Sequence, residues 1–249
     1  MTQVNVSWFV KGLKEHTADA YIIVDVLRFS TLVVTALSKG IDDIYVFSDL
    51  DAAYKFHKSI NAPLAAEVDG IKPPFADLDN SPTGIINYVE LYGLGNNKLV
   101  IRTTSGALLV SEAINLGLKN VFIGSLVNAH SVAKVIYRSG ISSINIVCAG
   151  YRRNQFAIED FLGAGAIIYE LSKYTELTLS DEALASLHTF DSVYTKGKIF
   201  DVIKLGRGGS FLWNTGREND VIFSSKVNTI DVVPYLINNV IKKYQNTNL

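Results

Sequence analysis

Short apolar runs alternate with helix-length segments along most of the chain, and this alternation constrains the fold more than any other feature. The runs YIIVDV (21–26) and INIVCAG (144–150) are apolar almost throughout, which is typical of strands that are covered on both faces. Strands that alternate with helices of 10–15 residues form parallel βαβ units. The pattern therefore predicts a three-layer α/β/α fold, with a largely parallel or mixed sheet and helices on both faces.

Caps and breakers give the expected boundaries of the elements. Ser81-Pro82 is an N-cap followed by proline at the first helical position, and Gly93 ends that helix. Ser48 is expected to cap another helix. We expect strands over 20–26, 44–47, 64–67, 99–102, 121–123 and 144–148. We expect helices over 30–38, 81–92, 105–116, 128–138 and 158–173.

The rhythm changes beyond Tyr174. We expect a helical stretch over 181–188, a turn at the GRGG motif (206–209) and a terminal helix near 233–244. No low-complexity linker separates this part from the rest. We therefore expect one α/β domain over 1–249 with a C-terminal elaboration, which could form a subdomain from about 175–249.

Composition narrows the class of protein. Apolar residues make up 48% of the 249 residues and charged residues 19%, which is typical of a globular chain. The formal net charge of −1 argues against binding to nucleic acid or to an anionic membrane. The N-terminus lacks the layout of a signal peptide, and the single cysteine, Cys148, allows no internal disulfide. We expect a cytoplasmic protein.

Polar residues gather where the predicted strands end. In an open parallel sheet, ligands bind outside the carboxyl ends of the strands. Carboxylate oxygens suit Mg²⁺, whereas arginines and helix-start amides suit phosphate. The pattern therefore predicts an anionic substrate held beside a hard cation. The strand-end residues are Asp25 with Arg28, Glu67, Thr103 with Thr104, Ser125, and Gly150 with Arg152 and Arg153.

Each of these residues also has a purely structural explanation. Asp25 could cap the next turn, with Arg28 as its salt-bridge partner. Glu159 and Asp160 stand at a helix start, where the helix dipole favours acids without any metal. The TTSG segment (103–106) could be an ordinary helix cap. It is their shared placement at strand ends that favours a site.

Other phosphate-handling motifs are missing. The chain contains no GxxxxGK[ST] motif, and the GAGA segment (163–166) falls inside a predicted helix, where a dinucleotide fingerprint does not occur. Phosphatases with an aspartyl nucleophile commonly carry a second acid two residues on, but Leu27 follows Asp25 at that spacing.

Seven segments, in order along the chain, resemble motifs of the 2-phosphosulfolactate phosphatase family. They extend from about Val24 to Pro234 and so cover most of the chain. The segments are VDVLRFSTLVVTAL (24–37), AEVDG (66–70), FADLDNSP (75–82), IRTTSGA (101–107), IGSLVNAHSVA (123–133), IVCAGYRRNQFAIEDFLGAGAI (146–167) and GRENDVIFSSKVNTIDVVP (216–234). Several positions depart from the family pattern, and they bear on the substrate. They are Ala66 and Asp79 for glycines, Ser105 for asparagine, Ala107 for threonine, an inserted Ala76, and Ser225 near a cysteine position.

The resemblance implies hydrolysis of a phosphate ester on a small sulfonated hydroxy acid, with Mg²⁺, in the route to coenzyme M. The implied metal ligands are Asp25, Glu67, Glu159 and Asp160. The implied catalytic residues are Asp25, Arg28 as phosphate clamp, Asp77 as ligand or general base, and Glu159. Because the second acid of an aspartyl-nucleophile motif is missing, we expect Asp25 to be a metal ligand first and a nucleophile second. The implied substrate-binding and phosphate-binding residues are Ser30, Thr31, Asn80, Ser81, Thr103, Thr104, Ser105, Gly106, Ser125, Asn128, and Arg152 for a carboxylate or sulfonate.

Three other interpretations stay open at this point. The chain could be a non-catalytic binding protein for a phosphorylated metabolite, or a phosphatase for a different phosphorylated hydroxy acid. It could also be an interaction subunit, because aromatic residues near the C-terminus could bury a face between two copies in a homodimer. Packing in the chain's own core explains those residues equally simply. They are Phe211, Trp213, Val232 and Tyr235. The expected partner is a small phosphorylated acid, with no nucleic acid and no membrane.

Overall fold

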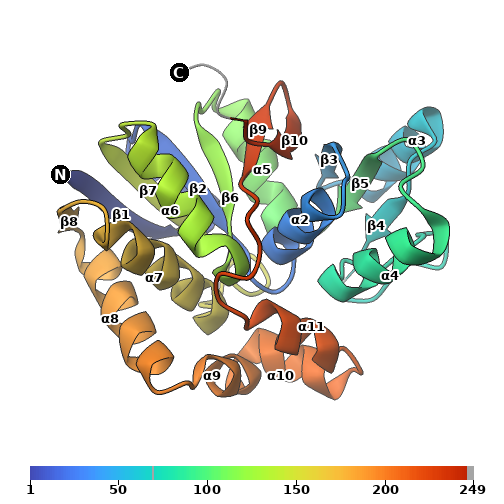
Figure 1. The fold of residues 1–249 in the computed structure, drawn as a ribbon. Coiled ribbons are helices and arrows are strands. Elements are labelled where there is room, and N and C mark those ends of the chain that lie inside the picture. Colours follow the sequence, from blue (N-terminus) through green and yellow to red (C-terminus); the bar gives the residue numbers. More distant parts are fainter. Residues whose placement is uncertain (69, 246–249) are drawn as a thin grey trace.

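The computed structural model describes residues 1–68 and 70–245, whose strands form one ten-stranded sheet with helices packed on both faces (Figure 1). The predicted α/β fold with a mixed, mostly parallel sheet is confirmed. The strands follow one another across the sheet in the order β4 (Leu64–Ala66), β5 (Lys98–Arg102), β3 (Asp43–Phe47), β10 (Val240–Lys243), β9 (Pro234–Ile237), β6 (Val121–Gly124), β2 (Ala20–Val24), β7 (Ser143–Cys148), β1 (Thr2–Trp8) and β8 (Leu177–Leu179).

Two groups of parallel strands make up this sheet. Strands β4, β5 and β3 form one group, and β6, β2, β7, β1 and β8 form the other. The hairpin β9–β10 lies between them and pairs antiparallel with both, through Tyr235 opposite Phe122 and Ile241 opposite Ile44. The β9–β10 hairpin therefore joins the two groups of parallel strands into one sheet.

Strand β2 shows why the apolar runs indicate coverage on both faces. Every residue from Ala20 to Val24 is buried. Ile22 and Val24 pack into one apolar cluster with α6 and α7, and Tyr21 and Ile23 pack into another with α2 and α5. Successive side chains of a strand point to opposite faces, so both faces must be apolar.

The helices lie around this sheet and connect its strands (Figure 1). Their bounds are α1 (Phe9–Glu15), α2 (Phe29–Ser38), α3 (Leu50–Ile60), α4 (Pro82–Tyr92), α5 (Gly106–Asn115), α6 (Ala129–Arg138), α7 (Ile158–Ser172), α8 (Asp181–Thr195), α9 (Ile199–Leu205), α10 (Arg207–Asn214) and α11 (Glu218–Ser224). None of them, in the ranges 1–68 and 70–245, is long and apolar enough to cross a bilayer.

Local capping agrees with the sequence at one helix and differs by one residue at another. The Ser81 hydroxyl accepts the Gly84 amide at 2.8 Å at the start of α4, as predicted. At α3 the cap is Asp49, whose carboxylate accepts the Ala52 amide at 2.7 Å. The predicted Ser48 cap is wrong, because α3 begins at Leu50 and Asp49 directly precedes it, within reach of the unpaired amides of the first turn.

The predicted terminal helix near 233–244 is wrong, because this segment is the β9–β10 hairpin. Asn238 and Asn239 have φ values of 49° and 64°. Two adjacent left-handed residues form the type I′ turn that two-residue hairpins favour, and asparagine tolerates it. The predicted GRGG turn is also wrong, since Gly208 and Gly209 lie inside α10. Strands β1 and β8 were not predicted.

The C-terminal segment belongs to the same sheet as the rest of the chain. It contributes β8 at one edge and β9–β10 in the middle. Phe211, Trp213 and Tyr235 pack against one apolar cluster, and Val232 lies in the other, which favours core packing over a dimer face. The homodimer and the division into subdomains stay predictions.

Candidate active site

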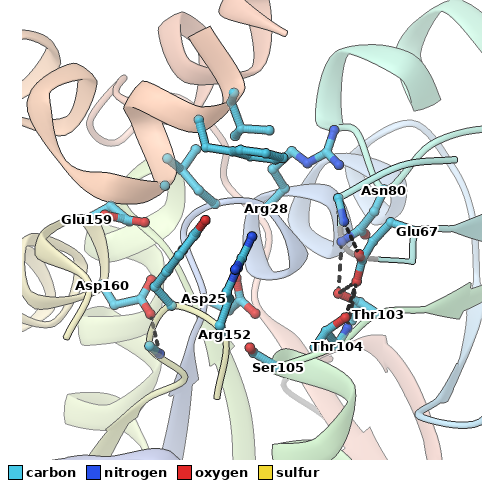
Figure 2. Close-up of a pocket in the computed structure, with 17 residues that line it drawn as sticks. Asp25, Arg28, Glu67, Asn80, Thr103, Thr104, Ser105, Arg152, Glu159 and Asp160 are labelled. Atoms are coloured by element: carbon cyan, nitrogen blue, oxygen red, sulfur yellow. Dashed lines mark hydrogen bonds between the residues drawn. The ribbon is translucent and has the colours of Figure 1, made fainter. Parts of the chain in front are cut away.

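A cavity of about 120 Å³ lies where both groups of parallel strands end (Figure 2). Strands β2 and β7 of one group contribute the residues that follow them, and so do β4 and β5 of the other. The starts of α7 and α10 complete the wall. Ten of the predicted site residues line it: Asp25, Arg28, Glu67, Asn80, Thr103, Thr104, Ser105, Arg152, Glu159 and Asp160.

Asp25 follows β2 and is held against the first turn of α2. Its backbone amide donates to the Ser30 hydroxyl at 2.9 Å, and the Ser30 amide donates to the Asp25 carbonyl at 2.7 Å. Its carboxylate accepts a long hydrogen bond of 3.4 Å from the Phe29 amide, and the Gly106 amide also stabilises its charged form. Burial, together with the negative charge of Glu67, raises the pKa of Asp25 to about 7.

Glu159 is the least compensated carboxylate in the cavity. It is 2% exposed, and its Oε2 atom has no hydrogen-bond partner among the described residues. Burial and the neighbouring charge of Asp25 raise its pKa to about 7. A buried charge without a partner is costly, so the site is built for something that compensates it.

Gly208 of α10 makes the room that the Glu159 carboxylate occupies. A Cβ atom at Gly208 would overlap the Glu159 carboxylate, and a Cβ at Gly206 would lie 3.4 Å from Oε2. Gly208 is therefore explained by the close approach of α10 to the Glu159 carboxylate, whereas a Cβ at Gly206 or Gly209 would first meet Ile158 or the Ile203 backbone.

Asp160, the neighbour of Glu159, ties two strand ends together. Its Oδ1 accepts the Val26 amide and its Oδ2 the Gly150 amide, both at 2.8 Å. Burial raises its pKa well above the ordinary value, and the charges of Asp25 and Glu159 add to this. Through these two hydrogen bonds, Asp160 fixes the loops after β2 and β7 relative to each other.

Glu67 lies on the opposite side of the cavity, next to Thr103 and Thr104 (Figure 2). Its Oε1 accepts the Thr104 amide at 2.8 Å and the hydroxyls of Thr104 and Thr103 at 2.7 and 3.2 Å. Its Oε2 accepts the Gly70 amide at 2.7 Å. This carboxylate is therefore fully supplied with donors from the protein itself.

Arg28 is paired with two carboxylates that the sequence analysis did not assign to the site. Its Nη1 lies 2.8 Å from Asp79 and 3.0 Å from Asp220, and its Nη2 donates to Asp79 at 3.1 Å. Arg217 also donates to Asp79, at 3.0 Å. Burial alone would raise the pKa of Asp79, but the hydrogen bonds and charges of the two arginines lower it. The expected salt bridge between Arg28 and Asp25 is therefore wrong, because Asp79 and Asp220 take the Arg28 guanidinium in the described residues.

Comparison with known proteins assigns this chain to a family. The family model described as 2-phosphosulpholactate phosphatase matches residues 9–239. The chain belongs to the 2-phosphosulpholactate phosphatase family. The motif resemblance and the enzyme class, a phosphoric monoester hydrolase, are thereby confirmed.

Curated relatives carry the same name. The probable 2-phosphosulfolactate phosphatase of Carboxydothermus hydrogenoformans is 32% identical over 233 residues, which cover 93% of this chain and 92% of the relative. The 2-phosphosulfolactate phosphatase of Methanocaldococcus jannaschii is 33% identical over 216 residues, 85% of this chain and 86% of the relative. The probable enzyme of Thermus thermophilus is 29% identical over 224 residues, 89% and 90% of the two chains.

The carboxylates of this phosphatase are compatible with a divalent metal ion that takes few protein ligands. Among the described residues no group of three or more acidic, histidine or cysteine side chains is arranged to hold a metal ion. Mg²⁺, however, is commonly bound by one or two carboxylates and keeps several waters. Asp25 and Glu159 offer oxygens with little or no protein hydrogen bonding. Metal ligation by Glu67 and Asp160, whose oxygens already accept strong donors, stays a prediction.

Several predicted phosphatase residues lie outside the described cavity lining and support it from behind. Four of them are buried: Ser30, Thr31, Ser125 and Asn128. Their side chains form hydrogen bonds within and between the loops that follow the strands; for example, Thr31 Oγ1 lies 2.8 Å from Ser125 Oγ. Ser81 donates to Asp220 at 2.6 Å. Binding of substrate through these side chains stays a prediction.

Asp77 and Gly106 also lie outside that lining. Asp77 accepts the Leu64 amide at 2.8 Å, at the amino end of β4, whereas the cavity lies at the carboxyl end. Gly106 packs against the Phe29 ring.

The lining also contains residues that were not predicted. They are Leu27, Gly70, Tyr151, Gly208, Phe211 and Leu212, and Gly150, predicted as a strand-end residue, completes the lining. The glycines of the GRGG motif were the one sequence feature that could have indicated that α10 approaches the cavity.

Proposed function

We propose that this phosphatase hydrolyses 2-phosphosulfolactate to 3-sulfolactate and phosphate with Mg²⁺, the step in the route to coenzyme M that the family resemblance implies. The names of the curated relatives support this substrate. The observation that carries the proposal is the unpartnered, buried carboxylate oxygen of Glu159 beside Asp25. Such a pair is costly in an empty protein and is compensated by a bound cation.

Asp25 and Glu159 would hold the metal. Magnesium, when bound, would supply a Lewis acid that offsets the charge of the phosphate oxygens. Glu67 and Asp160 would serve first as a frame, since their hydrogen bonds join the loops that carry the other groups. A role for Asp77 is not part of the proposal.

Arg152 and the polar residues after β5 would bind the phosphate. In Figure 2 the Arg152 side chain extends between the Asp25 side and the Glu67 side of the cavity. Ser105 and Asn80 line the same wall, and the Asn80 Nδ2 atom donates to Thr103 Oγ1 at 3.1 Å. Arg28, whose guanidinium is engaged by Asp79 and Asp220, would position the Asp25 loop and add positive charge near the substrate.

In the proposed reaction water attacks phosphorus in line with the bond to the hydroxy acid. The P–O bond to the leaving alcohol breaks, and phosphate and the free hydroxy acid form. A carboxylate oxygen must accept the proton of the attacking water. The Glu159 carboxylate, which lines the cavity, is the proposed acceptor and passes this proton on to the leaving oxygen. Asp25 acts as ligand and not as nucleophile.

The remaining parts of the proposal rest on the sequence alone. They are a cytoplasmic location, a homodimer, and a small phosphorylated acid as the binding partner. A non-catalytic binding protein is a poorer match, because it would not need two undercompensated carboxylates in one cavity.

Phosphate release tests the proposal directly. The chain, stripped of metal with a chelator, is assayed on 2-phosphosulfolactate and on other small phosphorylated acids, with and without added Mg²⁺. We expect release only with Mg²⁺, and loss of release in Asp25→Asn but not in Asp51→Asn, which removes an exposed carboxylate on α3. Absence of release from every ester would contradict the proposal.

A further inference from the structure

A second hollow adjoins the cavity, and arginines dominate its wall. Its volume is about 530 Å³, and Val68, Arg102, Thr104, Arg152 and Arg153 line it. Arg152 and Thr104 line the cavity as well, so the two spaces share a wall. We call this hollow the arginine groove. Neither Arg102 nor Arg153 has a role in the function proposed above.

Arg102 stands at the carboxyl end of β5 and lines the groove. Its Nη1 donates to the backbone carbonyl of Glu67. Its Nε is buried and has no partner among the described residues.

Arg152 and Arg153 stand together in a tight turn after β7. Tyr151 and Gln155 close the turn with two backbone hydrogen bonds of 2.8 and 3.0 Å. The φ values of the two arginines are 49° and 73°, a left-handed conformation that non-glycine residues seldom adopt. The Arg152 guanidinium carbon lies 5.4 Å from the centre of the Tyr151 ring, which steadies it.

The charge of the groove points to its ligand. Three guanidinium groups face one space, and the wall that the structure describes contains no carboxylate. Arg152 and Arg153 are exposed, so water screens much of the repulsion between the three positive charges, and an anion bound between them would lower it further. Guanidinium forks match carboxylate, sulfonate and phosphate oxygens.

We propose that the arginine groove binds a second acidic group, a carboxylate or sulfonate, of the same substrate molecule whose phosphate lies in the cavity. This inference rests on the proposed function. Arg152, at the shared wall, would contact both ends of the substrate, whereas Arg102 and Arg153 would contact only the distal acid. The groove would thus select phosphate esters that carry additional acids over esters that carry none.

The test compares three phosphate esters with a groove variant. The esters are 2-phosphosulfolactate with two further acids, 2-phospholactate with a carboxylate only, and isopropyl phosphate with neither. Arg153→Gln should lower kcat/KM for 2-phosphosulfolactate by about tenfold to a hundredfold, chiefly through KM, because a charged hydrogen bond is lost. The loss on isopropyl phosphate should be much smaller. The loss on 2-phospholactate shows whether the groove takes the carboxylate or the sulfonate.

Two variants serve as controls. Arg153→Lys keeps the charge and should recover part of the loss. Arg138→Gln removes an exposed arginine on α6 and should match the wild type on all three esters. Equal losses on all three esters in Arg153→Gln, or no loss on any, would overturn the inference.

A binding measurement separates this inference from the proposed function. Calorimetry with 3-sulfolactate as the probe should give a Kd about tenfold or more weaker in Arg153→Gln than in the wild type. If the wild type hydrolyses none of the esters but binds 3-sulfolactate more tightly than Arg153→Gln does, the proposed function is wrong and the proposed acid-binding groove is supported. Equal binding by both proteins refutes the groove.

Discussion

The two sides of the cavity contain carboxylates in opposite states. On one side Glu67 accepts four hydrogen bonds, from Gly70, Thr103 and Thr104. On the other side Glu159 has a buried oxygen without a partner, and Asp25 accepts a long hydrogen bond. A satisfied carboxylate stabilises the fold, whereas an unsatisfied one costs stability and is available for a ligand. Residue type and burial alone do not distinguish them.

The largest expected effect is on activity, from the unsatisfied side. Glu159→Gln should lower kcat by about 10²–10⁴-fold, because a proton acceptor and a metal ligand are removed together. Steady-state phosphate release at saturating Mg²⁺ measures this. A kcat close to that of the wild type would show that Glu159 does not take part in the reaction. The contrast between the two sides of the cavity would then have no catalytic meaning.

The same variant should gain stability when no metal is present. The pKa of Glu159 is raised from 4.5 to about 7 in the folded protein, so folding disfavours its charged form and stability falls as pH rises between these values. The neutral amide avoids this penalty. Thermal unfolding in chelator at pH 8 should therefore show a higher Tm for Glu159→Gln, by about 2–4 °C for each kcal/mol. The gain should vanish at pH 4.5.

The satisfied side should show the reverse pattern. Glu67→Gln replaces charge-assisted hydrogen bonds with weaker ones and turns one acceptor into a donor that faces the Gly70 amide or the Thr104 donors. We expect a loss of about 2 kcal/mol in the free energy of unfolding, measured by urea denaturation with and without Mg²⁺. A loss that Mg²⁺ abolishes or reverses would instead favour Glu67 as a metal ligand.

A smaller effect is expected from the helix that covers Glu159. Gly208→Ala places a methyl group on the Glu159 carboxylate, which must then move. We expect about a tenfold rise in the Mg²⁺ concentration for half-maximal activity, since displaced groups of a site commonly cost this much or more. Ser210→Ala, on the same helix, is the matched control. Equal effects in both variants would attribute the change to α10 as a whole.

The smallest effect concerns Asp79, which stands where the family motif has glycine. It pairs with Arg28 and Arg217. Asp79→Gly leaves Arg28 with Asp220 alone and should lower KM by about two- to fivefold, because a buried guanidinium seeks another acceptor. Its pKa is lowered from 3.8, so the stability it contributes is present above pH 3.8 and is lost as pH falls further. Acid unfolding should begin at higher pH in the variant, and an unchanged acid limb would argue against this pairing.

Local physical chemistry made much of this molecule predictable. The apolar runs of β2 and β7 predicted strands buried on both faces, since alternate side chains must enter both apolar clusters. The rule for strand ends placed Asp25, Glu67 and Thr104 near one rim, and the Ser81-Pro82 cap located α4. These features depend on residues within one turn or one strand of each other, so the sequence carries them directly.

Contacts between distant segments decided the rest. Arg28 meets Asp79 and Asp220, which lie 51 and 192 residues away, and Glu159 owes its room to Gly208 on another helix. The short strands β9 and β10 exist because each pairs with a neighbour from a different half of the sheet. Which carboxylate is satisfied and which is free depends on donors that only tertiary packing delivers. The sequence by itself determined the kind of site and its rim, and the tertiary structure decided which of its acids are left open to a ligand.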